Sequence, residues 1–386
     1  MTSRAIISLL SRHRQLAPTA AVYVSPLCLG SMNFGDAWKG RLGECTKDTS
    51  FEILDQFFQK GGNFIDTANA YHYGETETWL GEWMQSRGNR DQIVLATKYS
   101  GLYNMQDSKV QIRSNTQGNG SKSLRLSVES SLLRLKTSYI DILYVHWWDY
   151  TTSIPEIMHN LNDLVTSGKV LYLGISDCPA WIVSKANQYA RDHGLRQFVV
   201  YQGMWNAALR DVERDILPMC RVEGMAFCAY GALGQGEFQT EARLLERAKN
   251  REGRKQGTTS SRNKQVSKVL ETIADSKQTT ITSVALAYVR QKAPYVIPIV
   301  GGRKLEHANG NIDGLSVSLT DEELTQVETA HEWDPGFPHT FLSGTLLTGA
   351  DEPPKMASRA SEVWLTAMHG TFDWVEDPKA ISTPAS

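Results

Sequence analysis

Short apolar runs rich in β-branched residues alternate along the chain with longer segments whose apolar positions recur at helical spacing. The runs lie at residues 25–29, 63–66, 93–98, 140–146, 170–176, 198–202, 225–229 and 295–299. Helical patterns lie at residues 51–60, 76–85, 123–135, 157–166, 180–193, 212–221, 266–290 and 304–311. A strand and a helix repeated about eight times predict parallel strands with crossover helices. Eight such units over 386 residues favour an α/β fold of the (β/α)8 TIM-barrel class over an open doubly wound sheet.

Local signals support several of the predicted helix ends. Ser153 precedes Pro155 and Glu156, which predicts a helix start with proline in the first turn. That helix is predicted to end at Gly168, because glycine readily adopts the left-handed stop. Thr320 and Glu323 have the spacing of a capping box and predict a further helix toward His331.

Three segments interrupt the alternation of strands and helices. Residues 106–122 and 234–264 are polar and predict long loops after the third and seventh strands. The segment from residue 334 onward is rich in Pro and Gly but keeps large apolar residues: Phe337, Phe341, Trp364, Phe372 and Trp374. We therefore divide the chain into a basic N-terminal extension (1–20), a barrel (21–333) and a C-terminal tail (334–386). We expect the tail to lie over the active-site face as a substrate loop.

Composition excludes several classes of function. Hydrophobic residues make up 41% of the chain and charged residues 21%, with a net charge of −2, so nothing global favours nucleic acid or an anionic membrane. No apolar run is long enough to span a bilayer. Five cysteines without metal-ligand spacing predict free thiols in a reducing compartment, the cytoplasm. The first 35 residues lack acidic residues and contain Arg4, Arg12 and Arg14. This pattern fits a mitochondrial presequence or a short, poorly ordered basic extension, and we favour the extension.

Ionisable residues end four neighbouring predicted strands. Asp66 ends the second strand and leads into Tyr71, Lys98 ends the third, His146 the fourth, and Asp177 follows the fifth. Taken singly, each has a structural explanation: a solvated lysine, a satisfied core histidine or a helix-capping aspartate. Because the carboxyl ends of barrel strands meet on one face, the four together indicate an active site there.

Motifs along most of the chain resemble the aldo-keto reductase superfamily. They are Leu29-Gly30-Ser31-Met32, Gly62-Asn63-Phe64-Ile65-Asp66-Thr67-Ala68-x-x-Tyr71, Ala96-Thr97-Lys98, Asp141-Ile142-Leu143-Tyr144-Val145-His146, Gly168-Lys169-Val170, Gly174-Ile175-Ser176 and Pro298-x-x-Gly301-Gly302-Arg303. The resemblance extends from about residue 24 to residue 333. The doublet in His146-Trp147-Trp148-Asp149 and the long tail resemble the fungal aryl-alcohol dehydrogenase and norsolorinic acid reductase branch.

The resemblance implies a catalytic tetrad of Asp66, Tyr71, Lys98 and His146. Tyr71 would donate a proton to the carbonyl oxygen as hydride reaches the carbon. Lys98 would lower the pKa of that phenol from about 10, and Asp66 would keep the ammonium charged. His146 would hydrogen-bond the substrate oxygen. Tyr73 is close by, but the family spacing from Asp66 selects Tyr71.

The resemblance also implies bound NADP(H). Ser176 and Gln202 would hold the carboxamide with Asp177, at a place where relatives commonly have Asn. Asp177 fits equally as a cap for the helix after Pro179, the interpretation we prefer. Tyr230 would stack on the nicotinamide, and Arg303 would bind the 2′-phosphate at a helix start. The remaining cofactor residues would be Ser31, Met32, Asp66, Gly231, Leu233, Gly302, Lys304, His307 and Asn311. The chain lacks the Gly-x-Gly-x-x-Gly fingerprint after its first strand, which disfavours a Rossmann mode.

Aromatic residues at or just beyond the strand ends predict a pocket for a flat, apolar substrate. They are Phe34, Trp38, Tyr99, Trp147, Trp148 and Trp205. The predicted activity is NADPH-dependent reduction of an aromatic aldehyde or ketone, in fungal secondary metabolism or mycotoxin biosynthesis. An NADP(H)-binding regulatory barrel that acts by association, as channel β subunits do, is the alternative. A metal-dependent barrel enzyme is disfavoured, because the candidate ligands are few and Lys98 would repel a cation. The oligomeric state stays open.

Overall fold

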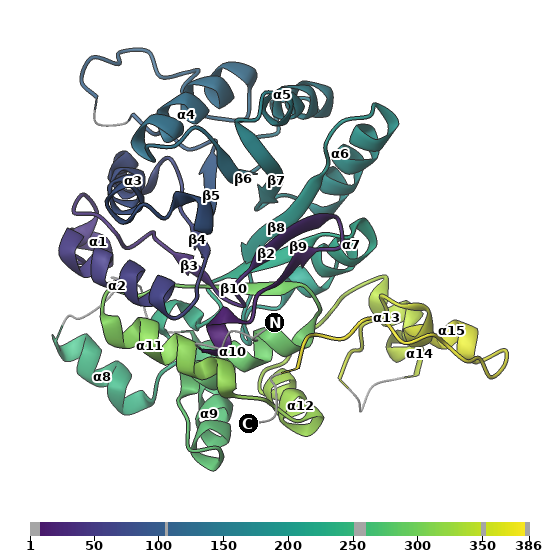
Figure 1. Cartoon of the computed structure of the whole chain (residues 1–386). Coiled ribbons are helices and arrows are strands. Elements are labelled where there is room, and N and C mark those ends of the chain that lie inside the picture. Colours follow the sequence, from purple (N-terminus) through teal and green to yellow (C-terminus); the bar gives the residue numbers. More distant parts are fainter. Residues whose placement is uncertain (1–7, 105–106, 251–259, 349–352, 383–386) are drawn as a thin grey trace, which may run out of the picture.

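The computed structural model has a closed barrel of parallel strands surrounded by helices (Figure 1). The structure describes residues 8–104, 107–250, 260–348 and 353–382. The barrel strands follow the order β10-β3-β4-β5-β6-β7-β8-β9. Their bounds are β3 Cys28–Gly30, β4 Phe64–Asp66, β5 Val94–Tyr99, β6 Ile140–Val145, β7 Val170–Ser176, β8 Phe198–Met204, β9 Ala226–Tyr230 and β10 Val296–Val300. Each overlaps one of the predicted apolar runs, so the predicted (β/α)8 architecture is confirmed.

The helices that cover the barrel lie between these strands. Their bounds are α2 Lys47–Gln59, α3 Glu75–Arg87, α4 Ser121–Arg134, α5 Ile154–Thr166, α6 Ala180–Asp192, α7 Ile216–Glu223, α9 Ser261–Ser276, α10 Ile281–Lys292, α11 Leu305–Asp313 and α12 Asp321–Thr329. The predicted ends of α5 and α12 are confirmed: the Ser153 side chain accepts a hydrogen bond from the Glu156 amide, and Thr320 and Glu323 form a capping box. Gly168 has a φ of 73°, the left-handed stop expected after α5.

The long helix predicted over residues 266–290 is two helices. Helix α9 ends at Ser276, and Gln278 adopts a φ of 53° in the turn that follows. The Thr280 side chain then caps α10 by accepting a hydrogen bond from the Ser283 amide. The sequence pattern does not reveal this break, because both helices bury apolar faces against the same core and the helical spacing of apolar residues continues on each side of it.

The N-terminal segment is packed from residue 9 onward, in contrast to the expected loose extension. A 3-10 turn (Leu9–Ser11) precedes a hairpin of β1 (Arg14–Ala17) and β2 (Ala20–Val24). Leu16 and Ala17 are fully buried in a cluster with Phe64 and Ala226, the first residues of β4 and β9. The hairpin therefore closes the amino-terminal end of the barrel, and the boundary placed at residue 20 divides it. Residues 1–7, with Arg4, lie outside the described residues.

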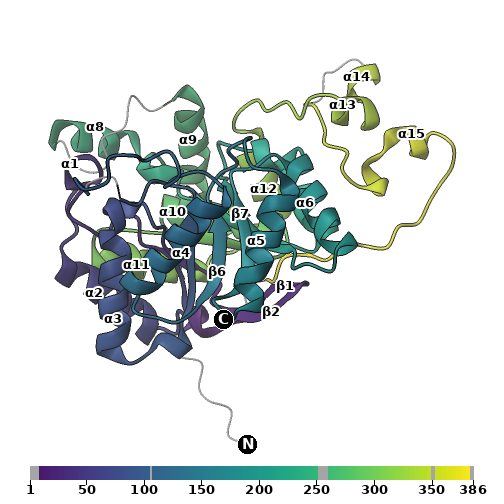
Figure 2. The same cartoon turned by 90° about the horizontal axis from the view of Figure 1, so that it is seen from above.

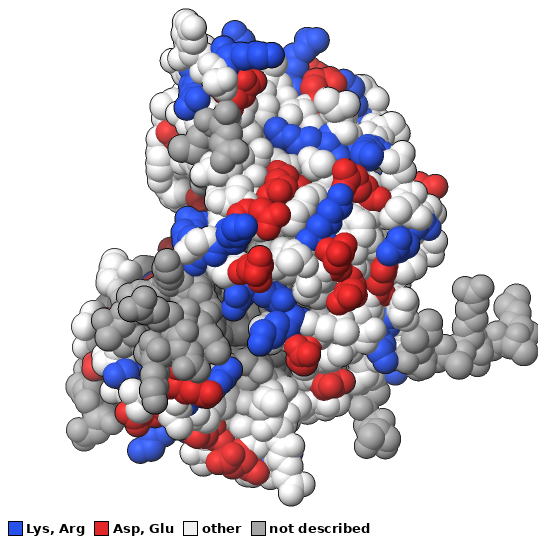
Figure 3. Space-filling model, turned by 90° about the vertical axis from the view of Figure 1, so that its left-hand side faces the viewer, with Lys and Arg blue, Asp and Glu red and all other residues white. Residues whose placement is uncertain are grey.

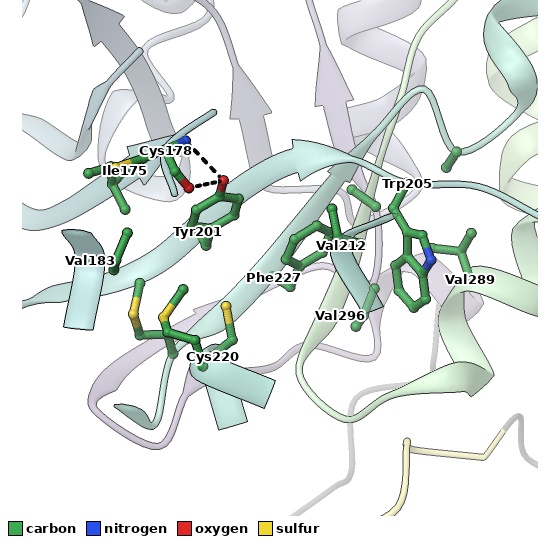
Figure 4. Packing of buried hydrophobic residues seen from close by; sticks show 14 of the residues in the cluster. Ile175, Cys178, Val183, Tyr201, Trp205, Val212, Cys220, Phe227, Val289 and Val296 are labelled. Atoms are coloured by element: carbon green, nitrogen blue, oxygen red, sulfur yellow. Dashed lines mark hydrogen bonds between the residues drawn. The ribbon is translucent and has the colours of Figure 1, made fainter. Parts of the chain in front are cut away.

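Two further apolar clusters fill the space between the barrel and its helices. In the larger one, Tyr201 packs against Phe227 with ring centroids 5.7 Å apart, and Trp205 meets the same ring edge-on (Figure 4). The Tyr201 hydroxyl donates to the Cys178 carbonyl and accepts from the Cys178 amide. Strand residues that face outward are thus as apolar as those that face into the barrel.

The loops after β5 and β9 are long, as predicted, and the second contains a helix, α8 (Glu241–Asn250). Residues 105–106 and 251–259 of these loops lie outside the described residues. Short helices α1 (Lys39–Leu42), α13 (His339–Leu342), α14 (Thr345–Thr348) and α15 (Trp364–Ala367) complete the chain. The face that carries α1, α2 and α8 intersperses basic and acidic side chains (Figure 3). In the described part of the chain, every helix is too short or too polar to cross a membrane.

The tail from residue 334 lies to one side of the barrel, with α13, α14 and α15 toward the end opposite the β1–β2 hairpin (Figure 2). Its main chain accepts hydrogen bonds from Arg214 at Asp334 and from Arg221 at Ser358, both of which belong to or adjoin α7. Its far end, Ile381 and Ser382, lines a cavity together with Leu9 at the opposite end of the barrel. The main-chain contacts hold the tail against the outer wall at α7, and its role as a substrate loop over the active-site face stays a prediction.

Candidate active site

The four tetrad candidates converge at the carboxyl ends of neighbouring strands. Asp66 ends β4, Lys98 is in β5, and His146 directly follows β6. Tyr71 begins a 3-10 turn (Tyr71–Gly74) that follows β4. Parallel pairing of β4 with β5 and of β5 with β6 brings these side chains to one edge of the barrel, as the sequence predicts.

Lys98 lies at the centre of the site and is completely buried. Its Nζ donates to Asp66 Oδ2 at 2.7 Å, to the Thr67 carbonyl at 2.7 Å and to the Tyr71 hydroxyl at 3.3 Å. Three acceptors match the three protons of an ammonium group. Burial alone would lower the pKa of Lys98, but the Asp66 carboxylate and the Tyr71 hydroxyl raise it above its ordinary value. Lys98 therefore carries its charge inside the protein.

Asp66 is held on both oxygens. Oδ2 accepts from Lys98, and Oδ1 accepts from Gln202 Nε2 at 2.8 Å. The Asp66 carbonyl accepts from Ser31 Oγ at 2.8 Å. The two side-chain bonds tie β4, β5 and β8 together at the carboxylate, and the Ser31 bond ties the segment after β3 to the Asp66 main chain, so the ammonium of Lys98 has little freedom to move.

The pKa of Tyr71 lies above the ordinary value of a phenol, whereas the sequence leads us to expect that Lys98 lowers it. Burial raises the pKa of Tyr71, the Lys98 ammonium opposes this, and the Asp66 carboxylate adds to the rise. Burial prevails, since a phenolate loses its hydration at this depth. Tyr71 thus keeps its proton at neutral pH, and Lys98 limits the cost of giving it up.

His146 faces Tyr71 edge-on, with ring centroids 6.0 Å apart at an interplanar angle of 78°. Burial and the Lys98 charge lower the pKa of His146 to about 3, so its imidazole is neutral. Its Nδ1 is buried and has no hydrogen-bond partner among the described residues. A buried polar atom normally has a hydrogen-bond partner, so this unsatisfied nitrogen indicates that the His146 ring belongs to a site that a bound polar group completes.

The residues predicted to hold the nicotinamide end adjacent strands. Ser176 pairs with Gln202 in the register of β7 and β8, and Tyr230 ends β9. The Tyr230 hydroxyl lies 3.2 Å from each carboxylate oxygen of Asp177. The preferred assignment of Asp177 as a helix cap is wrong: α6 begins after Pro179 without a side-chain cap hydrogen bond. Asp177 is turned toward Tyr230 instead, and its φ is 45°.

Three other predicted cofactor residues lie around this edge. The Met32 carbonyl interacts with His72 Nε2 at 3.1 Å. Gly231 has a φ of 68°, a conformation that a side chain would strain. Leu233 is half-buried and packs against two core clusters. These three residues could contact a cofactor through their main-chain atoms or apolar side chains, since none of them carries a charge.

The residues predicted to bind the adenosine phosphate follow β10. Lys304 precedes α11 and makes no side-chain cap hydrogen bond. The His307 amide donates to the Lys304 carbonyl at 3.1 Å, so the amides of Leu305 and Glu306, which precede it, are the ones that face the uncapped end of the helix. Arg303 lies against Gly43, where a β-carbon would overlap its guanidinium. The Arg303 amide donates to His307 Nδ1 at 3.3 Å. Gly302 is half-buried in front of this turn, and Asn311 is buried within α11.

Half of the predicted substrate residues are core residues. Phe34, Tyr99 and Trp205 are at most 1% exposed. The Tyr99 hydroxyl donates to the Asn119 carbonyl, and the Trp205 indole donates to Glu213. Because all three are buried, and the polar atoms of Tyr99 and Trp205 already have partners inside the protein, these residues do not fit the role of lining a substrate pocket.

The other three aromatic candidates are more open. Trp38 is half-buried and meets Tyr71 edge-on, with centroids 6.3 Å apart. Trp147 is 38% exposed, and Trp148 is half-buried against the larger core cluster. Trp38 and Trp147 are therefore the aromatic residues with surface to offer a ligand near the tetrad.

Sequence reasoning missed a buried network behind the tetrad. Glu77 is completely buried; it accepts from Thr97 Oγ1 at 2.7 Å and from Arg134 Nη1 at 3.1 Å. Arg134 Nη1 also donates to the carbonyl of Asn69, in the segment that leads to Tyr71. The available signal was a glutamate on the otherwise apolar face of α3. Among the described residues, no group of three His, Cys, Asp or Glu side chains could hold a metal ion.

Comparison with known proteins agrees with this geometry. The sequence profile of the Aldo/keto reductase family matches residues 26–332. Norsolorinic acid reductase B of Dothistroma septosporum is 64% identical over 370 residues, which cover 96% of this chain and 93% of that protein. Norsolorinic acid reductase B of Aspergillus parasiticus is 61% identical over 375 residues, 97% of each chain. Aryl-alcohol dehydrogenase (NADP+) of Phanerodontia chrysosporium is 49% identical over 346 residues, 86% of this chain and 89% of that protein.

These relatives confirm the fungal branch that the sequence motifs predict. Together with the barrel and the convergent strand ends, the family match decides the class of protein. The chain belongs to the aldo/keto reductase family, whose members are oxidoreductases with a nicotinamide cofactor.

Proposed function

We propose that this protein reduces an aromatic aldehyde or ketone with NADPH, with Tyr71 as the proton donor. The observation that carries the proposal is the hydrogen bond between the Tyr71 hydroxyl and the buried ammonium of Lys98, at 3.3 Å. The unpartnered Nδ1 of His146 lies on the neighbouring strand end. A donor, a charge that stabilises its conjugate base and a vacant hydrogen-bonding nitrogen together suit a carbonyl oxygen.

When bound, the nicotinamide supplies a hydride to the carbonyl carbon. Tyr71 then gives its phenolic proton to the carbonyl oxygen, so that the product is an alcohol. The remaining phenolate is stabilised by Lys98, whose charge is secured by Asp66 at 2.7 Å. His146, neutral because of burial and the Lys98 charge, orients the oxygen by a hydrogen bond. In the reverse direction Tyr71 takes the proton back, which allows oxidation of an aryl alcohol.

The residues present fit a nicotinamide at the ends of β7, β8 and β9. We assign Ser176 and Gln202 to the carboxamide, and the ring of Tyr230, steadied by Asp177, to the nicotinamide face. Ser31, Met32, Gly231 and Leu233 would complete the walls. These side chains come from neighbouring strand ends, so they can contact one flat ring.

We propose NADP(H) rather than NAD(H) because of the turn after β10. In the part of the chain that the structure describes, Arg303 has no ion-pair partner. It lies beside the open amino end of α11 and next to Lys304. A guanidinium and free helix amides favour a phosphate dianion. Gly302, His307 and Asn311 would shape this subsite. One relative, the aryl-alcohol dehydrogenase, carries NADP+ in its name.

The substrate class rests on the relatives and on the aromatic residues near Tyr71. Norsolorinic acid reductases and aryl-alcohol dehydrogenases are named for aromatic substrates. The Trp38 ring lies beside Tyr71, with centroids 6.3 Å apart, and Trp147 is partly exposed. We therefore propose a polyketide-type aryl ketone or an aryl aldehyde as substrate, in fungal secondary metabolism of the mycotoxin type.

Two further proposals concern the setting of the enzyme. All five cysteines are free and buried, which favours a reducing compartment such as the cytoplasm. The catalytic part would be residues 21–333, closed at its amino-terminal end by the hairpin whose first strand, β1, lies just before residue 21, and followed by the tail. The family match over residues 26–332 supports the extent of the catalytic part.

The proposal is tested by NADPH consumption with an aryl aldehyde and with norsolorinic acid. Tyr71→Phe removes the donor but keeps the ring, so kcat should fall by roughly 10²–10⁴-fold while NADPH still binds. Tyr73→Phe is the matched control, because this tyrosine lies two residues away in the same turn, and its kcat should be unchanged. Equal turnover by wild type and Tyr71→Phe would refute the assigned donor. Wild-type protein that binds NADPH but reduces neither substrate would refute the activity.

A further inference from the structure

The loop after β3, residues 31–38, is held along its length by the segment that follows Tyr71. We call these residues the Trp38 loop. The Thr76 hydroxyl donates to the Phe34 carbonyl at 2.7 Å. Glu75 Oε2 accepts from the amides of Asp36 and Ala37, at 2.7 and 3.2 Å. Two consecutive backbone amides and one carbonyl of the loop are thus bound by neighbouring side chains of α3.

His72 makes the remaining two contacts. The Trp38 amide donates to His72 Nδ1 at 3.1 Å, and His72 Nε2 lies 3.1 Å from the Met32 carbonyl. A backbone amide can only donate, so Nδ1 is unprotonated; Nε2 therefore carries the proton and donates to Met32. Only the neutral imidazole with its proton on Nε2 makes both bonds. His72 thus joins the first and last parts of the Trp38 loop.

The ring of His72 is closely packed. It is 2% exposed. A β-carbon at Gly35 would lie 2.4 Å from the imidazole, so the loop passes the ring as closely as backbone allows. His72 itself has a φ of 46°, a strained conformation for a residue with a side chain. Strain of this kind persists only where surrounding contacts impose it.

The two hydrogen bonds of His72, to Met32 and to Trp38, form what we call the His72 clamp. The clamp places the indole of Trp38 beside the proton donor. Trp38 stacks on His72 with centroids 4.9 Å apart and planes 30° apart. It meets Tyr71 edge-on at 6.3 Å and Tyr73 edge-on at 5.8 Å. The Arg41 guanidinium carbon lies 4.8 Å from its centroid. The indole is therefore fixed in both tilt and position next to the phenol.

We propose that His72 is a positioning residue: by clamping the Trp38 loop it makes the Trp38 indole a rigid aromatic wall beside Tyr71, which selects flat aromatic carbonyl compounds over small aliphatic ones. This inference rests on the proposed carbonyl reduction. An aromatic wall contributes most to binding when it is already oriented, because no ordering remains to be done when the substrate binds.

The charges around His72 act in opposite directions. Glu75 Oε2 lies 3.9 Å from Nδ1. Burial lowers the pKa of His72, the contact with Met32 and the charges of Glu75 and Asp36 oppose this, and the charge of Arg41 adds to it. Burial prevails, so the ring is neutral at physiological pH. Burial raises the pKa of the neighbouring Tyr71, so its phenol adds no charge in that range. The clamp is therefore closed at neutral pH and loosens in acid.

The first test compares substrates. His72→Phe keeps an aromatic ring against Trp38 but removes both hydrogen bonds. It should lower kcat/KM for an aryl aldehyde roughly tenfold, mainly through KM, and leave a short aliphatic aldehyde within about twofold. His72→Gln can still donate to Met32 and accept from Trp38, so it should restore most of the preference. Tyr73→Phe is the matched control in the same turn and should retain the wild-type preference. An unchanged preference in His72→Phe would overturn the inference.

The second test does not depend on turnover. Hydrogen–deuterium exchange of the peptide that contains residues 31–38 should be roughly tenfold faster in His72→Phe than in wild type or Tyr73→Phe, with His72→Gln in between. Wild-type exchange in His72→Phe would overturn the clamp even if the enzyme reduces no carbonyl compound. Absence of carbonyl reduction in the wild type would overturn the proposed function separately. Exchange elsewhere in the barrel, unchanged in each variant, shows that the fold is intact.

Discussion

The hydroxyl of Tyr71, a half-buried residue, receives a hydrogen bond from the ammonium of Lys98. The separation is 3.3 Å, and Lys98 is completely buried. Burial raises the pKa of Tyr71 above its ordinary value, although the lysine acts against the rise. Tyr71 is therefore protonated before the reaction and donates its proton during it, and Lys98 stabilises the phenolate that remains.

This relationship predicts the result of Lys98→Met. Without the ammonium, the phenolate left after proton transfer has no stabilising charge, so kcat should fall by roughly 10²–10⁴-fold. Wild-type activity should be nearly flat between about pH 5 and pH 9, because His146, Lys98 and Tyr71 all titrate outside that range. A pH–rate profile checks both statements. A midpoint near neutrality in the wild type would contradict the assignment.

The same substitution separates catalysis from stability. Lys98→Met leaves the Asp66 carboxylate buried without its partner, which should cost about 3–5 kcal/mol in the free energy of unfolding. Adding Asp66→Asn removes that charge and should restore much of the stability but none of the activity. Denaturant unfolding and turnover, measured on both variants, distinguish the two roles. Recovery of activity in the double variant would mean that the ammonium is dispensable.

Much of the fold could be predicted from the sequence because a parallel barrel leaves a strong periodic signal. The eight apolar runs, Gly168 after α5 and the capping box at Thr320 all follow from local chemistry. The break between α9 and α10 could not be predicted, because apolar positions continue on both sides of it. The hairpin that contains Leu16 was missed because short strands that close a barrel end have no helix after them to mark them.

The tetrad could be predicted, whereas the pocket could be predicted only in part. Asp66, Lys98 and His146 are ionisable residues in apolar runs, and parallel pairing necessarily brings them together. Aromatic residues carry no such signal, because a strand residue can face either the barrel interior or the helices, and both environments are apolar. Trp205 illustrates this: it follows a strand but is buried against Glu213. The contacts of His72 are with backbone atoms, which a side-chain pattern cannot reveal.

The turn after β10 predicts cofactor preference. Arg303→Ala should weaken NADPH binding by roughly 10–100-fold and leave NADH nearly unchanged, because only NADPH carries the 2′-phosphate. Arg41→Ala is a suitable control for the loss of a nearby positive charge, because its guanidinium lies over the Trp38 ring rather than in the turn after β10. Dissociation constants from fluorescence titration with each dinucleotide measure the effect. Equal weakening of both would show that Arg303 does not contact the 2′-phosphate.

The pair of Asp177 and Tyr230 predicts a graded effect on cofactor binding. Asp177→Ala removes the acceptor that lies 3.2 Å from the Tyr230 hydroxyl, so the ring should become freer and NADPH binding weaker by roughly five- to tenfold. Asp177→Asn keeps an acceptor and should bind nearly as the wild type does. Tyr230→Phe loses the same bond and should add nothing to Asp177→Ala in the double variant. Additive losses would show that the two residues act independently.

Arg134 predicts an effect on stability that depends on pH. Burial raises the pKa of Glu77, and Arg134 and Thr97 oppose the rise. Arg134→Met leaves Glu77 buried without its cation, so its folded-state pKa rises further above the unfolded value. Such a carboxyl group costs nothing below the unfolded pKa, near 4.3, and destabilises increasingly as pH rises from there toward the folded value. The loss in unfolding free energy should therefore be about 3–5 kcal/mol at pH 8 and much smaller near pH 5.

Denaturant unfolding across that pH range measures the loss, and the double variant Glu77→Leu with Arg134→Met is its control. With both charges removed, the pH dependence should disappear and most of the stability should return, because an apolar pair can replace a buried ion pair. The double variant also lacks the bond from Arg134 to the Asn69 carbonyl, which steadies the segment before Tyr71. Its kcat should stay several-fold below the wild-type value, since the donor is less well placed even when the fold is stable. Full recovery of kcat would mean that Arg134 only balances the charge of Glu77.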